Sequence, residues 1–404
     1  MTRGDAVPED ILTLKLGPFE LLGLAAFGIV LGGWIKHRLP ALDRLNIPTS
    51  IVGGLVYAVL ALLLRDRVLN FDLDTTIRDV LMVAFFTTIG MNASLRLLWI
   101  GGVQVVIFLG AAVVGLILQI AWGVGAATLF GLDPLIGIIP GAVALTGGPA
   151  TALAFGSVFE ELGVASATTL GVGAAMFGIV IGGLVGGYVG GHLIQRNKIE
   201  PAVVRDNPEV SLTPSAQDDE SSWFGNALML CLAMGLGVLL NRPFTEMGLT
   251  FPVYIGPMIC AAILRNIDEV GDGKRISVAK MDQMGVVALE LFIVMALLSL
   301  RLWEIANLAL PVFIILCGQI AILVAVCWLL VFRLMGRDYQ AAVMSTGYFG
   351  FMMGTTANAM ACMNELVRTH GPAPRAFFVV TIVGALFIDF VNALLITLTI
   401  NLLR

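Results

Sequence analysis

Long apolar runs alternate with short polar segments along almost the entire chain. A helix needs about 20 predominantly apolar residues to cross a hydrocarbon core about 30 Å thick, and most of the runs approach or exceed that length. We therefore expect membrane-spanning helices in two sets of five, and the predicted fold class is an all-α polytopic membrane protein. The first set lies near 17–36, 47–64, 79–98, 100–128 and 165–195, and the second near 222–241, 251–265, 283–302, 306–332 and 375–403.

Between the fourth and fifth run of each set lies a segment that is apolar but rich in glycine, threonine and serine, near 134–157 and 338–362. Two full crossings need about 40 residues, which neither segment has. A single crossing would fit the length of each segment. A re-entrant hairpin fits the glycine content better, because non-helical backbone is tolerated at membrane depth only where protein or a water-filled cavity surrounds it.

The two halves of the chain also resemble each other in sequence. Short matches in the same order pair Pro48 with Pro252, Ser94 with Ser299, Asp133 with Asp338 and Gly147 with Gly354. Because five spans reverse the side of the chain, the sequence predicts two inverted-topology repeats. Each repeat has five transmembrane helices and one re-entrant hairpin, giving about 10 spans and 2 hairpins. The repeats cover 1–195 and 222–404, with a linker at 196–221, an architecture typical of secondary transporters.

The distribution of positive charge predicts the orientation in the membrane. If the N-terminus lies outside, 15 of the 23 lysines and arginines fall in inner segments and 8 in outer ones. Cytoplasmic loops carry an excess of lysine and arginine. We therefore expect both termini outside and the linker, which is rich in proline, serine and charge, in the cytoplasm.

Composition excludes several classes of protein. Hydrophobic residues make up 58% of the 404 residues and charged residues only 13%, more apolar surface than a soluble protein of this length can hide. The net charge of −5 includes no basic block of the kind that binds nucleic acid. Walker A, HExxH and nucleophile-elbow motifs are absent, which predicts a protein that is not an enzyme and needs no cofactor. An ion gradient is then the expected source of energy.

Glycines and small polar residues coincide at the tips of the two predicted hairpins. A half-helix that begins at such a tip points free N–H groups and its positive dipole end inward, which suits an anionic carboxylate. The alternative is that these small residues only let helices pack closely. Arg337 and Arg375, beside the second hairpin, are further candidates for a substrate carboxylate. The predicted substrate-binding residues are Thr146, Gly147, Gly148, Thr151, Ser345, Gly347, Gly350, Gly354, Thr355, Thr356 and Asn358.

Asp389 lies within the last predicted span, where a carboxylate is costly and needs a partner. Asn392 follows three residues later on the same helical face, and Asn92 interrupts an apolar run in the first half. Oxygen atoms of these side chains suit a hard cation, so we predict Asn92, Asp389 and Asn392 as sodium ligands. Asp389 could instead cap a helix or pair with an arginine. Glu290 could titrate a proton or pair with a neighbour.

Four segments carry a resemblance to a known family: "FDLDTTIRDVLMVAFFTTIGMNA", "LDPLIGIIPGAVALTGGPATALAFG", "STGYFGFMMGTTANAMACM" and "VGALFIDFVNALLI". They resemble the sodium/glutamate symporter (ESS) family, and the resemblance runs from about Leu16 to Leu403. It implies sodium-coupled glutamate uptake, an inverted repeat of five spans plus one re-entrant loop, and homodimers that work by an elevator-like motion.

The leading hypothesis is therefore a secondary active transporter of an inner membrane that couples L-glutamate uptake to sodium. Its expected partners are glutamate, sodium ions and the lipid bilayer, and no nucleic acid. The alternatives are a sodium-coupled symporter of another carboxylate, a cation/proton antiporter, and a channel or non-transporting membrane scaffold.

Overall fold

The computed structural model describes residues 12–40, 42, 47–64, 69–199, 222–249, 252–271, 275–300 and 309–404, and this part of the chain is almost entirely helical. Most of the predicted linker, 200–221, lies outside the described residues. The elements, in chain order, are β1 (Leu12–Leu16), α1 (Pro18–Arg38), α3 (Thr49–Leu64), β2 (Leu69–Leu73), α4 (Thr76–Asn92), α5 (Leu95–Ile100), α6 (Gly102–Leu129), α7 (Pro134–Ile138), η1 (Ile139–Thr146), α8 (Gly148–Glu161), α9 (Ala167–Arg196), α10 (Trp223–Glu246), α11 (Ile255–Val270), α12 (Val278–Leu298), α13 (Ala309–Val326), η4 (Cys327–Val331), α14 (Phe332–Leu334), α15 (Tyr339–Met352), α16 (Thr356–His370), α17 (Pro374–Ile382), η5 (Val383–Phe387) and α18 (Ile388–Leu403).

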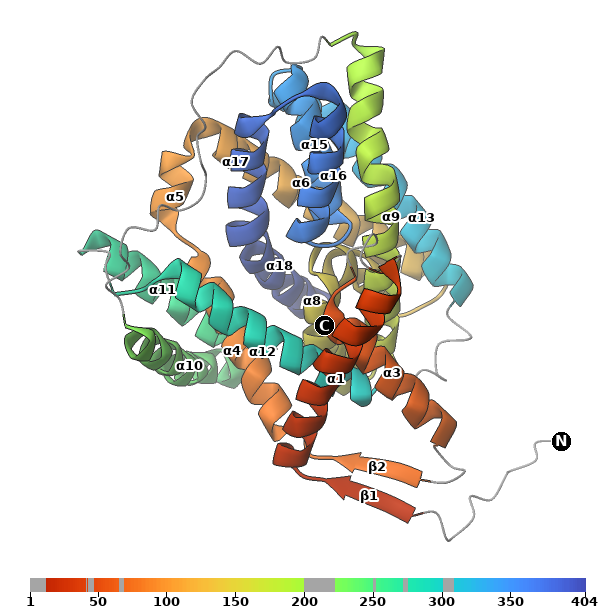
Figure 1. The fold of residues 1–404 in the computed structure, drawn as a ribbon, viewed down its shortest axis with the longest axis vertical. Helices are drawn as coiled ribbons and strands as arrows, with labels where there is room; N and C mark the ends of the chain where they lie inside the picture. Colours follow the sequence, from red (N-terminus) through yellow and green to blue (C-terminus); the bar gives the residue numbers. More distant parts are fainter. Residues whose placement is uncertain are drawn as a thin grey trace, which may run out of the picture.

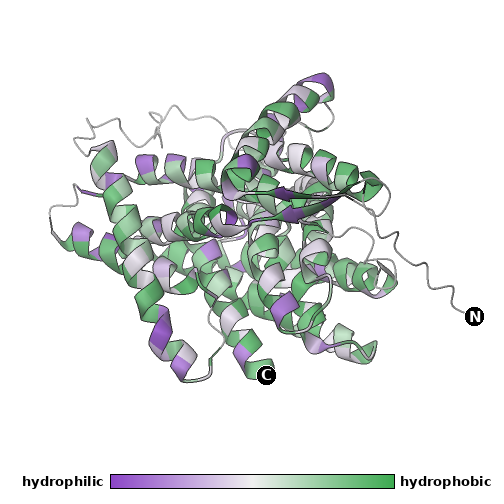
Figure 2. Ribbon diagram, turned by 90° about the horizontal axis from the view of Figure 1, so that it is seen from below, coloured by the Kyte–Doolittle hydropathy of each residue, from purple (hydrophilic) through white to green (hydrophobic). Residues whose placement is uncertain are grey.

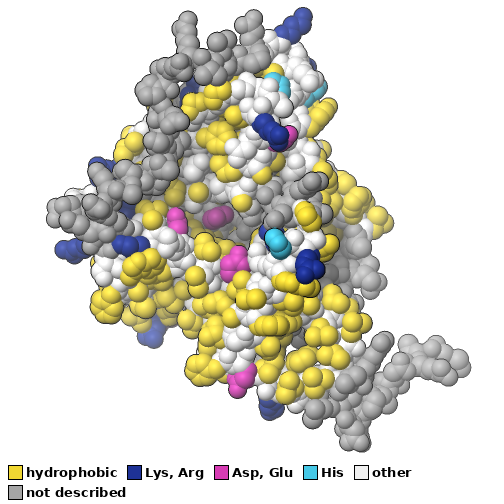
Figure 3. Space-filling view, viewed as in Figure 1, with side chains coloured by type: hydrophobic (Ala, Val, Ile, Leu, Met, Phe, Trp, Pro, Cys, Tyr) yellow, Lys and Arg dark blue, Asp and Glu magenta, His cyan; other side chains and the backbone are white. Residues whose placement is uncertain are grey.

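Seven of the described helices are long and apolar enough to cross a membrane, as expected for a multi-pass membrane protein. They are Pro18–Arg38, Gly102–Leu129, Ala167–Arg196, Trp223–Glu246, Val278–Leu298, Leu310–Leu334 and Pro374–Leu403. Hydrophobic colour predominates over most of the helical ribbon in Figure 2, and apolar side chains cover much of the face shown in Figure 3. Large apolar side chains are exposed on the surface; Phe19 and Trp99, for example, are 78% and 82% exposed. Such an apolar surface is suited to contact with lipid chains. The count of ten spans remains a prediction.

The prediction of an all-α fold missed one small feature. Strands β1 and β2 pair in parallel, with Leu12 opposite Leu69 and Leu16 opposite Leu73. Lys15 and Asp72 face each other across the pair, with Nζ and Oδ2 3.9 Å apart. Each strand has only five residues and immediately precedes a long apolar helix. The hydropathy of the helix dominates the local pattern, so the sequence did not predict the strand.

The helices fall into two groups, which are visible in the lower and upper parts of Figure 1. We call α1, α3, α4, α10, α11 and α12 the six-helix group, because these helices contact mainly one another. We call the remainder from α6 onward the hairpin group: α6 to α9 and α13 to α18 with their π-helical segments. Contacts between the groups are few, chiefly α8 with α12 and α18 with α4 and α11.

Helix α9 packs tightly in the hairpin group because one of its faces consists of glycines four residues apart. A Cβ atom at Gly178 would lie 2.4 Å from the carbonyl oxygen of Met353, and one at Gly190 would lie 2.1 Å from Oγ1 of Thr346. Neither distance is possible for real atoms, so only glycine lets α9 approach α15 this closely. Small residues serve this purpose widely in membrane proteins.

We expect the Gly178→Ala substitution to destabilise the protein by about 1–3 kcal/mol, because the added methyl group overpacks a closed contact. Thermal unfolding of the detergent-solubilised protein measures the change. Gly187→Ala is the matched control, since Gly187 lies on the same helix and has no atom within 4 Å of the added Cβ. Equal stability of the two variants would contradict this account of α9.

Candidate functional site

Two pairs of short helices occupy corresponding places in the two halves of the chain. The first pair is α7–η1 followed by α8, and the second is α15 followed by α16. Aspartates cap the first helix of each pair: Asp133 accepts a hydrogen bond from the Leu135 N–H at 2.8 Å, and Asp338 accepts one from the Ala341 N–H at 2.7 Å. Side-chain oxygens at this position satisfy N–H groups that have no partner within the helix.

The tips of the two pairs meet. Gly148, which begins α8, has a φ of +65°, and a Cβ placed on it would lie 3.3 Å from the Gly354 carbonyl oxygen and 3.5 Å from Cγ2 of Thr355. Both glycines therefore lie at a contact between two backbones. The N-termini of α8 and α16 consequently lie close to each other, although nearly the length of one half of the chain separates them in sequence.

The N-termini of α8 and α16 differ in their capping. Thr355 caps α16, since its Oγ1 accepts a hydrogen bond from the Asn358 N–H at 3.4 Å. Gly147 precedes α8 and supplies no side-chain cap. The first N–H groups of an α-helix have no intrahelical acceptor, and Thr151 lies in this uncapped first turn. An anion between the tips would meet the positive dipole ends of both helices.

A polar network holds the first tip in place. Thr146 donates a hydrogen bond from Oγ1 to Oε1 of Gln119 at 2.7 Å, and Nε2 of Gln119 donates to the Met352 carbonyl at 3.1 Å. Gln319 donates from Nε2 to the Gln119 carbonyl at 2.9 Å. All three side chains are buried. Gln119 therefore connects the end of η1 to the end of α15, a positioning role that their separation in sequence concealed.

The other predicted residues of the second pair mostly face its interior. Ser345 donates to the Ala341 carbonyl at 2.9 Å. A Cβ on Gly350 would lie 2.5 Å from Cα of Ala359, and one on Gly347 would lie 2.4 Å from Sδ of Met363. Gly347 and Gly350 thus form the contact between α15 and α16, below the tip, whereas Ser345 faces Cys327 of η4. Thr356 is closer to the tip and donates to the Gly384 carbonyl at 2.5 Å.

The last span brings Asn392 to a break in the first pair. Pro140 and Gly141 leave the helical conformation (Gly141 has φ −141° and ψ −117°), because proline lacks an N–H group and glycine tolerates such angles. Nδ2 of Asn392 donates to the carbonyl of Ala142, next to the break, at 2.8 Å. Its Oδ1 is buried without a hydrogen-bond partner.

Asp389 lies one turn before Asn392, immediately after the π-helical segment η5, and is half-buried. In the described part of the chain its carboxylate has no hydrogen bond or ion pair. Arg375 is engaged elsewhere, with Nη2 2.6 Å from Oδ2 of Asp338. Among the described residues, no arginine pairs with Asp389 to make it a purely structural residue.

Unpartnered amide oxygens recur around the tips. Oδ1 of Asn358, Oδ1 of Asn392 and Oε1 of Gln319 are all buried and accept no hydrogen bond from the protein. Asn358 lies in the first turn of α16 and donates from Nδ2 to the Ile179 carbonyl of α9 at 3.3 Å. Leaving a buried polar atom unpaired costs about 1–3 kcal/mol, and a small cation would satisfy such oxygens.

Asn92, the third predicted sodium ligand, belongs to the six-helix group. Its Nδ2 donates to Oδ1 of Asp282 on α12 at 2.5 Å. No described hydrogen bond connects Asn92 with Asp389 or Asn392, which lie on α18 of the hairpin group. Its part in sodium binding remains a prediction.

Glu290 also lies in the six-helix group. Its Oε2 accepts a hydrogen bond from the N–H of Ser50, at the start of α3, at 3.0 Å. Such a carboxylate stabilises the positive end of a helix.

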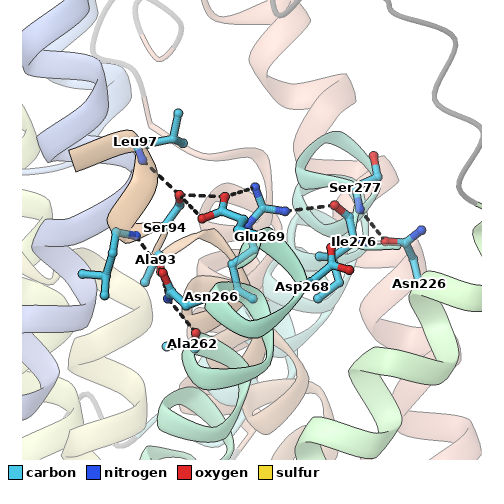
Figure 4. Close-up of polar contacts among 12 residues, drawn as sticks. Ala93, Ser94, Leu97, Asn226, Ala262, Asn266, Asp268, Glu269, Ile276 and Ser277 are labelled. Atoms are coloured by element: carbon cyan, nitrogen blue, oxygen red, sulfur yellow. Dashed lines mark hydrogen bonds and ion pairs between the residues drawn. The ribbon is translucent and has the colours of Figure 1, made fainter. Parts of the chain in front are cut away.

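A second polar cluster fixes the point where the chain leaves the six-helix group (Figure 4). Ser94, between α4 and α5, donates to Glu269 of α11 at 2.7 Å, and Arg265 pairs with the same carboxylate at 2.7 Å. Asn266 donates to the Ala93 carbonyl at 2.9 Å and accepts from the Leu95 N–H at 2.9 Å. The bend before α5 is thus held by side chains from α11.

A cleft between the two groups contains a residue that the sequence did not single out. Arg78 at the start of α4 lines a small cavity of about 70 Å³ together with Ser157 of α8, Thr168 of α9 and Phe292 of α12. Arg78 also donates from Nε to Oδ1 of Asp79 at 2.9 Å. The cavity is walled by helices of both groups, so a relative movement of the groups would change its shape.

Comparison with known proteins identifies the family. The family model for sodium/glutamate symporters matches residues 14–372. The chain belongs to the sodium/glutamate symporter family. It is 35% identical over 393 residues to a sodium/glutamate symporter of Escherichia coli (strain K12), covering 95% of this chain and 97% of the relative. A sodium/glutamate symporter of Haemophilus influenzae (strain ATCC 51907 / DSM 11121 / KW20 / Rd) is 32% identical over 398 residues, covering 95% and 97%. The family resemblance predicted from the motifs is confirmed.

We expect Thr146→Val and Gln119→Leu each to destabilise this symporter-family protein by about 1–3 kcal/mol, because each leaves a buried partner unpaired. In the double variant the losses should not add, with a coupling of at least about 0.5 kcal/mol. Thermal unfolding in detergent measures all three variants. Gln104→Leu is the control, since Gln104 lies on the same helix α6 and has no described side-chain hydrogen bond. Additive losses would mean that the two side chains act independently.

Proposed function

We propose that this protein is a secondary active transporter that carries L-glutamate into the cell together with sodium ions. The observation that carries the proposal is the meeting of the α8 and α16 N-termini, with the unpartnered amide oxygens of Asn358 and Asn392 nearby. This arrangement presents positive helix ends to an anion and oxygen atoms to a cation within one buried region. Membership of the sodium/glutamate symporter family supports the same pair of solutes.

Glutamate binds, in this proposal, with its carboxylates at the two tips. Free N–H groups of the uncapped α8 turn bind one carboxylate, and the turn formed by Gly354 and Thr355 with Asn358 behind it binds the other. Backbone N–H groups are well suited to this task because they are fixed by the helices and need no reordering when the ligand arrives. The positive φ at Gly148 and its contact with the Gly354 carbonyl explain why position 148 is glycine, and the closeness of Asn358 explains why position 354 is glycine.

Sodium binds at Asp389 and at Oδ1 of Asn392, with backbone carbonyls of the broken helix η1 completing its coordination. These groups provide one negative charge and neutral oxygens, the ligands that a hard monovalent cation prefers. Glutamate carries a net charge of −1, and moving one charge through 100 mV changes the free energy by about 2.3 kcal/mol. At least two cations per glutamate are therefore needed before the membrane potential favours uptake.

The two helix pairs act as re-entrant hairpins that enter from opposite faces of an inverted repeat. In support, both pairs follow a long apolar helix, both start at a capping aspartate and both are followed by a helix of 30 residues, Ala167–Arg196 and Pro374–Leu403. Broken helices at membrane depth need protein around them, and the tips have α9 and α18 beside them. We place both termini outside an inner membrane and the linker in the cytoplasm.

Transport proceeds by an elevator-like motion in which the hairpin group moves against the six-helix group, within a homodimer. The sparse contacts between the groups and the cleft that contains Arg78 support this division. Arg78 would attract an anion toward the cleft through its positive charge. Coupling requires that the hairpin group moves when sodium and glutamate are both bound or both absent, and resists moving when only one is present.

The function is tested by reconstituting the full chain in vesicles and following labelled glutamate with and without an inward sodium gradient. We expect uptake that depends on sodium, and we expect Asp389→Asn to raise the sodium concentration for half-maximal uptake at least about tenfold, because the cation loses its anionic ligand. Glutamate uptake that is the same with and without the sodium gradient would disprove coupling to sodium.

The control for Asp389→Asn is Asp133→Asn, since asparagine also caps helices and Asp133 lies away from the proposed cation site. Its sodium dependence should be that of the wild type. An unchanged sodium dependence in Asp389→Asn would remove that residue from the site. Sodium-driven proton movement in vesicles without glutamate would indicate an antiporter instead.

We further expect Gly148→Ala to weaken glutamate binding about tenfold. A residue with a side chain resists a positive φ by roughly 1–2 kcal/mol, and the added methyl group lies against Gly354 and Thr355. Isothermal titration with glutamate in sodium buffer measures the affinity. Gly163→Ala is the matched control, because Gly163 also has a positive φ (+94°) but no neighbouring atom within 4 Å. Similar losses in both variants would show that backbone strain, and not the tip contact, is responsible.

A further inference from the structure

Three arginines surround a cavity at the end of the hairpin group opposite to the start of α9. The cavity, of about 260 Å³, lies where α9 ends beside η4, and its polar lining comes from Arg196, Asn197, Trp328, Arg333 and Arg337. We call it the three-arginine pocket. Figure 1 shows the C-terminal end of α9 at the top of the molecule, at the end of the hairpin group that positive charge predicts to be cytoplasmic.

The three arginine side chains are exposed, and in the described part of the chain none of them forms a side-chain hydrogen bond or ion pair. Arg78, Arg265 and Arg375, by contrast, each pair with a carboxylate. Like charges gathered around one cavity repel one another. An anion in the pocket would relieve this repulsion and accept several charge-assisted hydrogen bonds.

Trp328 also lines the pocket and carries an unpaired donor. Its indole Nε1 is buried without a hydrogen-bond partner, and its ring stacks on His192 with centroids 4.7 Å apart. A tryptophan N–H can only donate, so the missing partner is an acceptor. The arginines and this N–H together match an oxyanion with several acceptor oxygens.

The place of the pocket decides which oxyanion fits best. Both helices that form it, Ala167–Arg196 and Leu310–Leu334, are long and apolar enough to span the membrane, so the pocket lies at their ends, where lipid phosphates lie. Leu193 and Phe332 add buried apolar side chains to its lining, and Leu329 beside them is 58% exposed. A ligand with an anionic head and an apolar tail satisfies both parts, whereas a free anion satisfies only one.

We propose that the three-arginine pocket binds the phosphate of an anionic phospholipid headgroup at the membrane surface. Basic pockets between membrane helices bind such headgroups. The lipid phosphate connects α9 to α14, and so helps to hold the two halves of the hairpin group together. This site shares no lining residue with the tips, so it does not depend on the identity of the transported solute.

The test uses the full chain, purified in detergent, stripped of lipid and titrated with phosphatidylglycerol, with phosphatidylcholine or with inorganic phosphate. Native mass spectrometry counts the bound molecules, and thermal unfolding follows the stabilisation. We expect saturable binding of phosphatidylglycerol, with a rise in melting temperature, and much weaker binding of the other two. The double variant Arg333→Gln/Arg337→Gln should bind phosphatidylglycerol about thirtyfold more weakly, because each arginine near an anionic surface contributes about a factor of five.

The matched control is the double variant Arg242→Gln/Arg368→Gln, which removes two exposed arginines outside the pocket and should bind as the wild type does. Trp328→Phe keeps the ring and loses the N–H donor, so it should weaken binding by a smaller factor while preserving the fold. Equal affinity of both double variants, or equal affinity of the wild type for the two lipids, would overturn the proposal. If inorganic phosphate bound as tightly as phosphatidylglycerol, the ligand of the pocket would be a soluble anion and not a lipid headgroup.

Discussion

A helix end inside a membrane leaves N–H and C=O groups that lipid cannot satisfy, and in the proposed re-entrant arrangement this constraint applies to the tips of α8 and α16. The α8 and α16 tips are tolerable because they face each other and lie against α9. Gly148 lets the two tips touch, and Gly178 lets α9 lie directly against the end of α15. Three buried amide oxygens without protein partners, those of Gln319, Asn358 and Asn392, lie around these tips, where the proposed ligands would satisfy them.

Carboxylates in the described helices divide according to whether they have partners. Glu290 accepts from the start of α3, Glu269 binds Ser94 and Arg265, and Asp338 binds Arg375. Each of these holds two segments together. Asp389 has no such partner in the described part of the chain, although it lies within the last long span. A charge that is costly at membrane depth and is not used to hold the fold is the natural candidate for a cation ligand.

The separation into two helix groups connects this centre to a mechanism. Buried hydrogen bonds connect helices within each group, as the Gln119 network and the cluster around Glu269 show. Between the groups lie few helix contacts and the cleft that contains Arg78. Two bodies that are each internally bonded and weakly bonded to each other can move as units. The proposed binding site lies within one of them and would travel with it.

The sequence by itself determined the membrane class, the order of the long helices, the two glycine-rich segments and the family, because hydropathy and motifs are local properties of the chain. Only the tertiary structure decided which polar residues have partners. It showed that Asn392 reaches Ala142, that Asn92 turns to Asp282, and that Gln119 supports Thr146. It also revealed the strand pair β1–β2 and the three-arginine pocket. Each of these depends on contacts between residues far apart in sequence, and no local pattern records such distances.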